Sequence, residues 1–378
     1  LQAGRSAESE RVWREILGRI EAGAAYDAAY DQAVAFRHIG LAVAAQGRPA
    51  QAIGYHQRAL AGFERIGSRE EGVGSKQAKQ MAGYVHADLA DNLQAVGQFD
   101  DAQNHYEISL KIARQNEDHR SAGVALGQLG TLAMRRGELG AARERYTEAL
   151  KTFQQLGEPL AEAKVWHLLG SVALEVNDWK NADRNYRQAL QIYEQINDLP
   201  NRAMTYNQLA LVAKGAGRFD DAERWYLRAI ELDEQLGNPK EVAMDYNNLA
   251  GLYLDQDRLD EAESYARRAL EIKEQLDLSV RPWTTYAVLA QIAEARGQVA
   301  AAARWRRKEQ ESYAAYSGAL HQVREWVPVI RSAVRACNGD DQAAEQVESQ
   351  LQAFEEGWPT TVTAVRQVLA GERDIEVL

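Results

Sequence analysis

The apolar residues of this chain fall at helical rather than strand spacing. Residues 246–253 give an example, with the apolar and small positions Tyr246, Leu249, Ala250 and Tyr253. These positions follow the series i, i+3, i+4 and i+7, so they share one face of a helix. Turn-forming segments such as GAGRFDD and DQDRLDE separate such helices along the chain. The pattern therefore predicts an all-α protein made of short amphipathic helices.

The helices come in pairs, and small residues recur in them at a fixed interval. In the first helix of each pair the small residues are Ala90, Gly130, Gly170, Ala210, Ala250 and Ala290, with Gly40 in the same role. In the second helix they are Ala52, Ala102, Ala142, Ala182, Ala222, Ala262 and Ala302. A larger side chain at these points would force the paired helices apart. A single pair cannot bury its apolar face, so the pairs must stack, which predicts a right-handed α-solenoid of about seven helical hairpins.

The repeats define three predicted regions. A helical lead-in covers residues 1–32, the repeat array covers 33–316, and a C-terminal helical cap covers 317–378. The step from Gly40 to Ala90 is longer than the later steps, such as that from Ala90 to Gly130, which predicts a flexible insert at 67–82 that contains the segment GVGSK. The cap is expected because the array needs its open end covered, and a tail that binds a partner is the alternative.

Residues with known preferences for helix ends mark the predicted helix boundaries. Asp220 and Asp260 are predicted N-caps, since their carboxylates can accept backbone N–H bonds. The predicted left-handed residues at helix ends are Gly157, Asn197 and Gly237, followed by Pro159, Pro200 and Pro239 where the next helix begins.

The motif WHLLGSVALEVNDWKNADRNYRQAL, residues 166–190, resembles the tetratricopeptide repeat (TPR). The 40-residue period of this chain exceeds the period of roughly 34 residues usual in that family. It is similar to a subgroup with lengthened helices found in peptide-binding scaffolds. The last copy departs from the pattern, with Arg306 in place of the usual Tyr and Glu309 in place of the usual Ala. The array with its helical tail also resembles the C-terminal sensor of bacterial STAND-type signalling ATPases.

Composition narrows the class of partner. The 378 residues carry a net charge of −11, which disfavours nucleic acid or an anionic membrane as partner, because both need a basic surface. The single cysteine, Cys337, fits a reducing compartment, and the absence of a long apolar run predicts no membrane span. We therefore expect a cytoplasmic protein that binds a protein or peptide, with homo-oligomer formation left open.

No sequence motif for catalysis, metal or cofactor binding is found. GVGSK lacks the spacing and the preceding strand of a phosphate loop, and the seven histidines show no i, i+3 or i+4 pair. His86 and the tyrosine stripe (Tyr106, Tyr146, Tyr186, Tyr226) are interpreted as core residues. We therefore expect a non-enzymatic protein without cofactor or metal.

In TPR arrays the first helix of each pair lines the concave face, and its variable positions contact the ligand. This resemblance implies partner-binding residues at Asp88, Asp91, Gln128, Arg135, Lys164, His167, Asn207, Gln208, Lys214, Asn247 and Asn248. Asn207 and Asn247 share one repeat position, so we expect both to hydrogen-bond an extended peptide at successive points. Copies 3 to 5 are net basic and copies 6 and 7 acidic, which would orient a ligand of opposite polarity.

Two hypotheses follow from the sequence. The first is a protein-interaction scaffold that binds an extended peptide or a partner helix in its concave groove. The alternative is a trigger-sensing TPR region of a larger STAND-type signalling or defence protein. A stand-alone enzyme is disfavoured, because no catalytic constellation is found.

Overall fold

A computed structural model describes residues 2–23, 28–68, 73–276, 281–316 and 341–354, with single positions at 329, 332–333, 336, 362 and 365–366. The chain divides into two compact units, Leu1–Leu232 and Asp233–Leu378, and each is described by itself. Every regular element in these described ranges is an α-helix. None of the described helices combines the length and apolar character that a membrane crossing requires.

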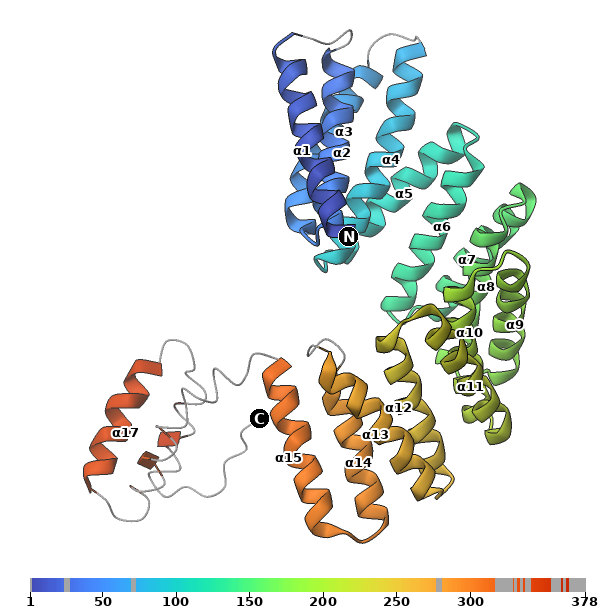
Figure 1. Cartoon of the computed structure of the whole chain (residues 1–378). Coiled ribbons are helices and arrows are strands. Elements are labelled where there is room, and N and C mark those ends of the chain that lie inside the picture. The colour runs from blue at the N-terminus through green and yellow to red at the C-terminus, as the bar shows by residue number, and fades with distance from the viewer. Residues whose placement is uncertain are drawn as a thin grey trace. The chain divides into compact units, whose positions relative to one another are not determined.

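The first unit is a stack of helices that pack in chain order, each against the next (Figure 1). Its helices are α1 (Gln2–Glu21), α2 (Ala28–Ala45), α3 (Pro49–Gly67), α4 (Val73–Ala95), α5 (Phe99–Gln115), α6 (His119–Arg135), α7 (Leu139–Leu156), α8 (Pro159–Glu175), α9 (Trp179–Gln195) and α10 (Leu199–Gly215). Helix α11 (Phe219–Leu236) spans the boundary between the units.

The second unit continues the same scheme. Its helices are α12 (Pro239–Asp255), α13 (Leu259–Gln275), α14 (Pro282–Ala295), α15 (Val299–Tyr316) and α17 (Asp341–Phe354). Helices α12 to α15 again pack in chain order. The predicted all-α solenoid of stacked helical hairpins is therefore confirmed.

The glycines at the small positions of the first helices meet large rings of the partner helix. A Cβ placed on Gly130 would lie 2.6 Å from the Tyr146 ring, and one on Gly170 would lie 2.8 Å from the Tyr186 ring. Gly40 has the same relation to His56, at 2.7 Å. The predicted reason for the small positions is confirmed at these three glycines, because an added side chain would collide with the ring of the partner helix.

The predicted helix C-termini are confirmed, but the predicted N-caps are wrong. Gly157, Asn197 and Gly237 have positive φ angles of 66°, 53° and 67°. Helix α13 instead begins after Arg258, which makes no side-chain cap, so Asp260 lies inside the first turn. Asp220 likewise lies inside the first turn of α11.

The tight turn before α13 explains this shift. Asp257 adopts a positive φ of 58°, and the Arg258 carbonyl then accepts the Ala262 amide at 3.0 Å, which starts the helix before Asp260. Side-chain caps occur at other helices, where Asp118, Asp178 and Asp198 each accept a backbone N–H three residues later.

The predicted insert at 67–82 is helical where it is described. Val73 to Lys76 form the first turn of α4, which has 23 residues where α6 has 17. The Ser75 hydroxyl is buried and donates a 2.9 Å hydrogen bond to the Gly67 carbonyl. The extra residues therefore lengthen a helix, although residues 69–72 lie outside the described part of the chain.

Both ends of the chain carry additional helices. Trp13 of α1 stacks on His38 of α2 with ring centroids 4.1 Å apart, which covers one edge of the first hairpin. In the C-terminal region Val329, Val347, Leu351 and Val362 form a small apolar cluster. The single cysteine, Cys337, lies outside the described residues.

Candidate functional site

The outward positions of α4, α6, α8 and α10 form a surface that we call the first-helix face. Residues one repeat apart in sequence occupy the same position on successive first helices, so they form rows across this face. Neighbouring helices are linked there by side-chain bonds, such as the 3.2 Å bond from the Gln128 amide on α6 to the Asp91 carboxylate on α4. The face is therefore continuous across the repeats of the first unit.

Buried tyrosines of the second helices reach this face with their hydroxyl groups. Tyr106, Tyr146 and Tyr186 are fully buried, which confirms their interpretation as core residues. Their hydroxyls bond to polar residues of the preceding first helix, in the pairs Asp91–Tyr106 at 2.5 Å, Thr131–Tyr146 at 3.0 Å and Ser171–Tyr186 at 3.0 Å. Helices α4, α6 and α8 therefore each have one polar side chain held in place from below.

Asp91 is the carboxylate among these polar positions. Desolvation by the neighbouring atoms raises the pKa of its carboxyl, the Tyr106 hydrogen bond lowers it, and the nearby Asp88 charge raises it again, for a net increase. Burial and the same Asp91 contact raise the pKa of the Tyr106 hydroxyl. Asp91 thus already accepts bonds from Tyr106 and Gln128, two groups that hold the fold together.

Asp88, a second predicted partner residue, is paired within the protein. The Arg37 Nε atom on α2 lies 2.5 Å from the Asp88 carboxylate, and both side chains are largely buried. This pair joins the first two hairpins. Its two charges cancel, so little net charge remains at this position of the face.

His167 lies inside the row formed with Asn207. Its Nδ1 atom is 3.5 Å from the Thr205 hydroxyl on α10, and its ring makes an edge contact with Tyr186 at 4.9 Å. Burial lowers the pKa of His167 to about 4, so the imidazole is neutral near pH 7. This residue acts as a packed hydrogen-bonding group rather than as a surface charge.

Arg135 and Lys164 remain open to solvent on the first-helix face. Across the described ranges no carboxylate forms an ion pair with either of them. Gln208 is half-buried and accepts a 3.4 Å bond from the Tyr186 hydroxyl. Asn207 and Lys214 are half-buried and interact with other groups of the protein.

Two predicted partner residues belong to the second unit. The Asn247 side-chain oxygen on α12 accepts a 2.8 Å bond from the Thr285 hydroxyl on α14, while Asn248 is exposed. Asn247 therefore links two neighbouring first helices, as Asp91 and Gln128 do in the first unit. The contact of Asn207 and Asn247 with one peptide stays a prediction.

The sequence reasoning missed apolar residues on the same face. Val124, Met204 and Leu211 are 40%, 41% and 43% exposed. Val124 and Met204 occupy the repeat position of Lys164, which the sequence had already assigned to the face. The sequence did contain a signal for them, namely an apolar residue at a repeat position that was expected to be exposed to solvent.

A contact between the buried His86 and the half-buried His105 was also missed. The Nδ1 atoms of His86 and His105 lie 2.7 Å apart between α4 and α5, and burial is the main cause that lowers both pKa values, that of His86 to about 4. Their separation in sequence reflects packing between helices, so a search at helical spacing does not detect it. In the ranges that the structure describes, no three His, Cys, Asp or Glu side chains form a group suited to a metal ion.

Comparison with sequence families identifies the class of protein. A model of the MalT-like TPR region matches residues 160–369, which is more than half of the chain, and a tetratricopeptide repeat model matches residues 82–155. The chain belongs to the MalT-like TPR family. The resemblance to the tetratricopeptide repeat is thereby confirmed. A comparison with curated proteins gave no match.

Solved structures share the fold of this MalT-like TPR chain at low sequence identity. The apo quorum sensor NprR from B. thuringiensis is 16% identical, with a TM-score of 0.59 over 81% of this chain and 83% of that chain. A STAND protein with a tetratricopeptide repeat sensor from Pyrococcus horikoshii is 12% identical, with a TM-score of 0.58 over 83% of this chain and 54% of that chain. BtubC from P. vanneervenii is 20% identical, with a TM-score of 0.52 over 62% of this chain and 91% of that chain.

Proposed function

We propose that the first-helix face binds an extended peptide or a helix of a partner protein, without catalysis. The observation that carries this proposal is that the face bears two exposed cations without an ion-pair partner, Arg135 and Lys164, together with exposed apolar side chains. The MalT-like TPR family and the TPR fold agree with such a role. The proposed ligand carries an acidic group beside apolar anchors.

The arrangement favours binding because part of the face is rigid before a ligand arrives. The hydroxyls of Tyr146 and Tyr186 hold Thr131 and Ser171 in single orientations. A face whose polar groups are already ordered loses less conformational entropy on binding, which leaves more of the contact energy for affinity.

The charged and apolar residues have different roles in this proposal. Arg135 and Lys164 attract an acidic partner, which raises the association rate and sets the direction of binding. Val124, Met204 and Leu211 provide apolar surface into which side chains of the partner pack. Methionine suits such a role because its flexible side chain adapts to different partners.

The amide side chains remain part of the proposal in a narrower form, with Asn207 and Gln208 on the first-helix face and Asn247 as a separate proposed contact on α12. An Asn amide can donate to a peptide carbonyl and accept from a peptide N–H at once. The Asn247 oxygen already accepts from Thr285, so its NH₂ group is the part proposed to contact a ligand. Gln208 is proposed to act in the same way, since its oxygen receives the Tyr186 hydroxyl.

A selection experiment tests the proposed peptide site. A displayed library of random peptides is panned on the wild-type protein, and recovered peptides are titrated against the double variant Arg135→Ala, Lys164→Ala. We expect acidic, apolar-rich sequences whose affinity drops at least about tenfold in the variant, a loss of roughly 1.4 kcal/mol. The control Lys151→Ala removes an exposed cation from second helix α7 and should leave the affinity unchanged. Equal binding by all three proteins would refute the site.

A second proposed role is the sensing of a trigger as part of a larger signalling protein. The MalT-like TPR match and the fold shared with the STAND protein from Pyrococcus horikoshii support it. An immunoblot of source cells with an antibody against this chain tests it. A band much larger than the 42.1 kDa of this chain supports the role, whereas a band at that mass contradicts it.

A further inference from the structure

The second unit contains a pocket of about 400 Å³ between second helices α13 and α15, with first helix α14 as its floor. The first unit has a pocket of about 450 Å³ between α7 and α9 over α8. The residues that line them correspond three repeats apart, as Leu289 does to Leu169 and Arg304 to Arg184. The hollow itself is therefore a product of the repeat, and any specific function must come from the side chains.

The charges of the two pockets differ. The pocket over α14 is lined by the cations Arg267, Arg296, Arg304 and Lys308 and by one carboxylate, Glu263. The pocket over α8 has two cations, Arg143 and Arg184, and one carboxylate, Asp178. The excess of cations over α14 stands out in a chain whose net charge is −11.

Part of this charge serves the repeat architecture. Arg296 bonds to Glu263 and, at 2.5 Å, to Asp260, both on the preceding second helix. Arg136 makes the same kind of contact four repeats earlier, at 2.5 Å from Asp100. Arg296 is therefore a link between adjacent repeats, and we do not assign it to a ligand.

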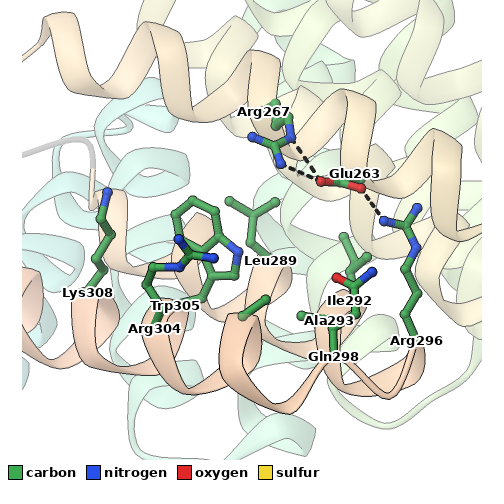
Figure 2. Close-up of a pocket in the computed structure, with 11 residues that line it drawn as sticks. Glu263, Arg267, Leu289, Ile292, Ala293, Arg296, Gln298, Arg304, Trp305 and Lys308 are labelled. Atoms are coloured by element: carbon green, nitrogen blue, oxygen red, sulfur yellow. Dashed lines mark hydrogen bonds and ion pairs between the residues drawn. The ribbon is translucent and has the colours of Figure 1, made fainter.

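Arg304 and Lys308 make no such ion-pair link between repeats, although Lys308 lies over Tyr286 and Trp305 as Arg268 lies over Tyr246 and Tyr265 one repeat earlier. They lie one turn apart on α15, on the side of the pocket that faces Arg267 of α13 (Figure 2). In the described part of the chain neither side chain forms an ion pair with a carboxylate. The Lys308 ammonium is instead held 5.2 Å from the centre of the Trp305 ring and 5.5 Å from that of Tyr286.

Arg267 completes the cluster from the opposite wall. Its Nε and Nη2 atoms bond to Glu263 at 3.0 and 2.5 Å, which leaves its Nη1 group for another acceptor. Three cations around one hollow repel each other, and an anion placed between them would remove this repulsion. Guanidinium groups match the oxygens of a phosphoryl group with paired hydrogen bonds.

We propose that the pocket over α14 binds the phosphoryl group of a small organic phosphate through Arg267, Arg304 and Lys308. A volume of about 400 Å³ lies in the range of small-molecule sites. The two negative charges of a phosphoryl group also neutralise three cations more fully than the single charge of a carboxylate ligand would. Trp305 lines the same pocket and offers an aromatic surface to the organic part of the ligand. This site is independent of the peptide site on the first-helix face.

Calorimetric titration with inorganic phosphate and with adenosine monophosphate at low salt tests the proposal. We expect both to bind the wild-type chain and to lose at least about tenfold in affinity in the variant Arg304→Ala, Lys308→Ala. The conservative variants Arg304→Gln and Lys308→Gln repeat the test with less change in packing, and circular dichroism checks that each variant is folded. Arg184→Ala, at the equivalent position over α8, is the matched control and should bind as the wild type does.

Comparison of inorganic phosphate with adenosine monophosphate shows whether the organic part of the ligand contributes to binding. Tighter binding of the nucleotide, with the difference lost in Trp305→Ala, would extend the site to an aromatic phosphate ester. Absence of binding by both ligands up to roughly 10 mM would overturn the proposal. So would an equal loss in Arg184→Ala, or tighter binding of a glutamate-rich peptide than of either phosphate.

Discussion

The Tyr106 hydroxyl donates a 2.5 Å hydrogen bond to the Asp91 carboxylate, and this bond joins the second helix of a hairpin to the outward side of its first helix. The tyrosine ring is fully buried, whereas the carboxylate lies on the surface. One side chain thus takes part in the core and also orients a polar group on the first-helix face. Stability and surface chemistry are linked at this position.

Removal of this bond should lower stability and change the titration of Asp91. Tyr106→Phe keeps the ring but removes the donor, so we expect a loss of about 1 kcal/mol in the free energy of unfolding. The pKa of Asp91 should rise further, because the Tyr106 bond lowers it in the wild type. Urea denaturation and a carboxyl-detected NMR titration measure the two effects. A double-mutant cycle with Asp91→Thr, which copies Thr131, should give a clear coupling energy, and additive effects would contradict the link.

The tight contact at Gly130 predicts opposite effects for two alanine substitutions in α6. Gly130→Ala places a methyl group against the Tyr146 ring, so we expect a loss of about 1 kcal/mol or more. Gly127→Ala is the matched control, since no atom lies within 4 Å of its added Cβ. Better helix propensity should make that variant more stable by about 0.5–1 kcal/mol. Thermal unfolding compares them, and the same sign for both would count against the contact.

Acid should destabilise the first unit through His167. Its pKa of about 4 in the fold lies below the ordinary 6.5, so the unfolded chain binds the proton more readily. The associated stability is present above about pH 6.5 and is lost as the pH falls toward 4, by up to about 3 kcal/mol. His167→Asn, which copies Asn207, should reduce this pH dependence in denaturation curves. The exposed His119→Asn variant serves as control, and an unchanged slope in His167→Asn would exclude this origin.

Lys273 should give a pH dependence of the same sign, but at alkaline pH. The side chain is buried and donates a 2.9 Å bond to the Thr284 hydroxyl, and burial lowers its pKa to about 8 from 10.5. The charged form is disfavoured in the fold, so stability should increase as the pH rises from about 8 to 10.5.

Replacement of Lys273 by an apolar residue tests this prediction. Lys273→Met should raise the free energy of unfolding at pH 7, by up to roughly 3 kcal/mol, and abolish the alkaline gain. The equivalent core positions Tyr193 and Phe153 show that an aromatic or apolar side chain suits this site. A less stable Met variant would show that the ammonium contributes a net favourable interaction.

Features that depend on contacts or backbone preferences within a single repeat could be predicted from the sequence. The small residue at Gly130 was predictable, because a large ring recurs at a fixed distance in the partner helix. The left-handed Gly157 was predictable from backbone preferences alone. Asp260 was not, since the helix starts where the preceding turn closes, and its carboxylate instead meets Arg296 in the next repeat.

The chemistry of the surface could be predicted only in part for the same reason. Variable positions indicated which residues face outward, as with the exposed Lys164. They did not indicate that Arg37 and Asp88 pair, or that Thr285 bonds to Asn247, because these contacts cross from one repeat to another. Such bonds depend on the length and direction of individual side chains in two repeats. A repeat pattern describes only what the copies share, so it does not reveal them.

The corresponding pockets over α8 and α14 have a consequence for how such a chain can change. Their floor residues Leu169 and Leu289 belong to the core, whereas Arg184 and Arg304 project from its surface at one repeat position. Duplication of a repeat would copy the hollow with its floor, and point mutations on its rim would then alter its ligand preference. A MalT-like TPR chain can in this way acquire new recognition sites without redesign of its interior.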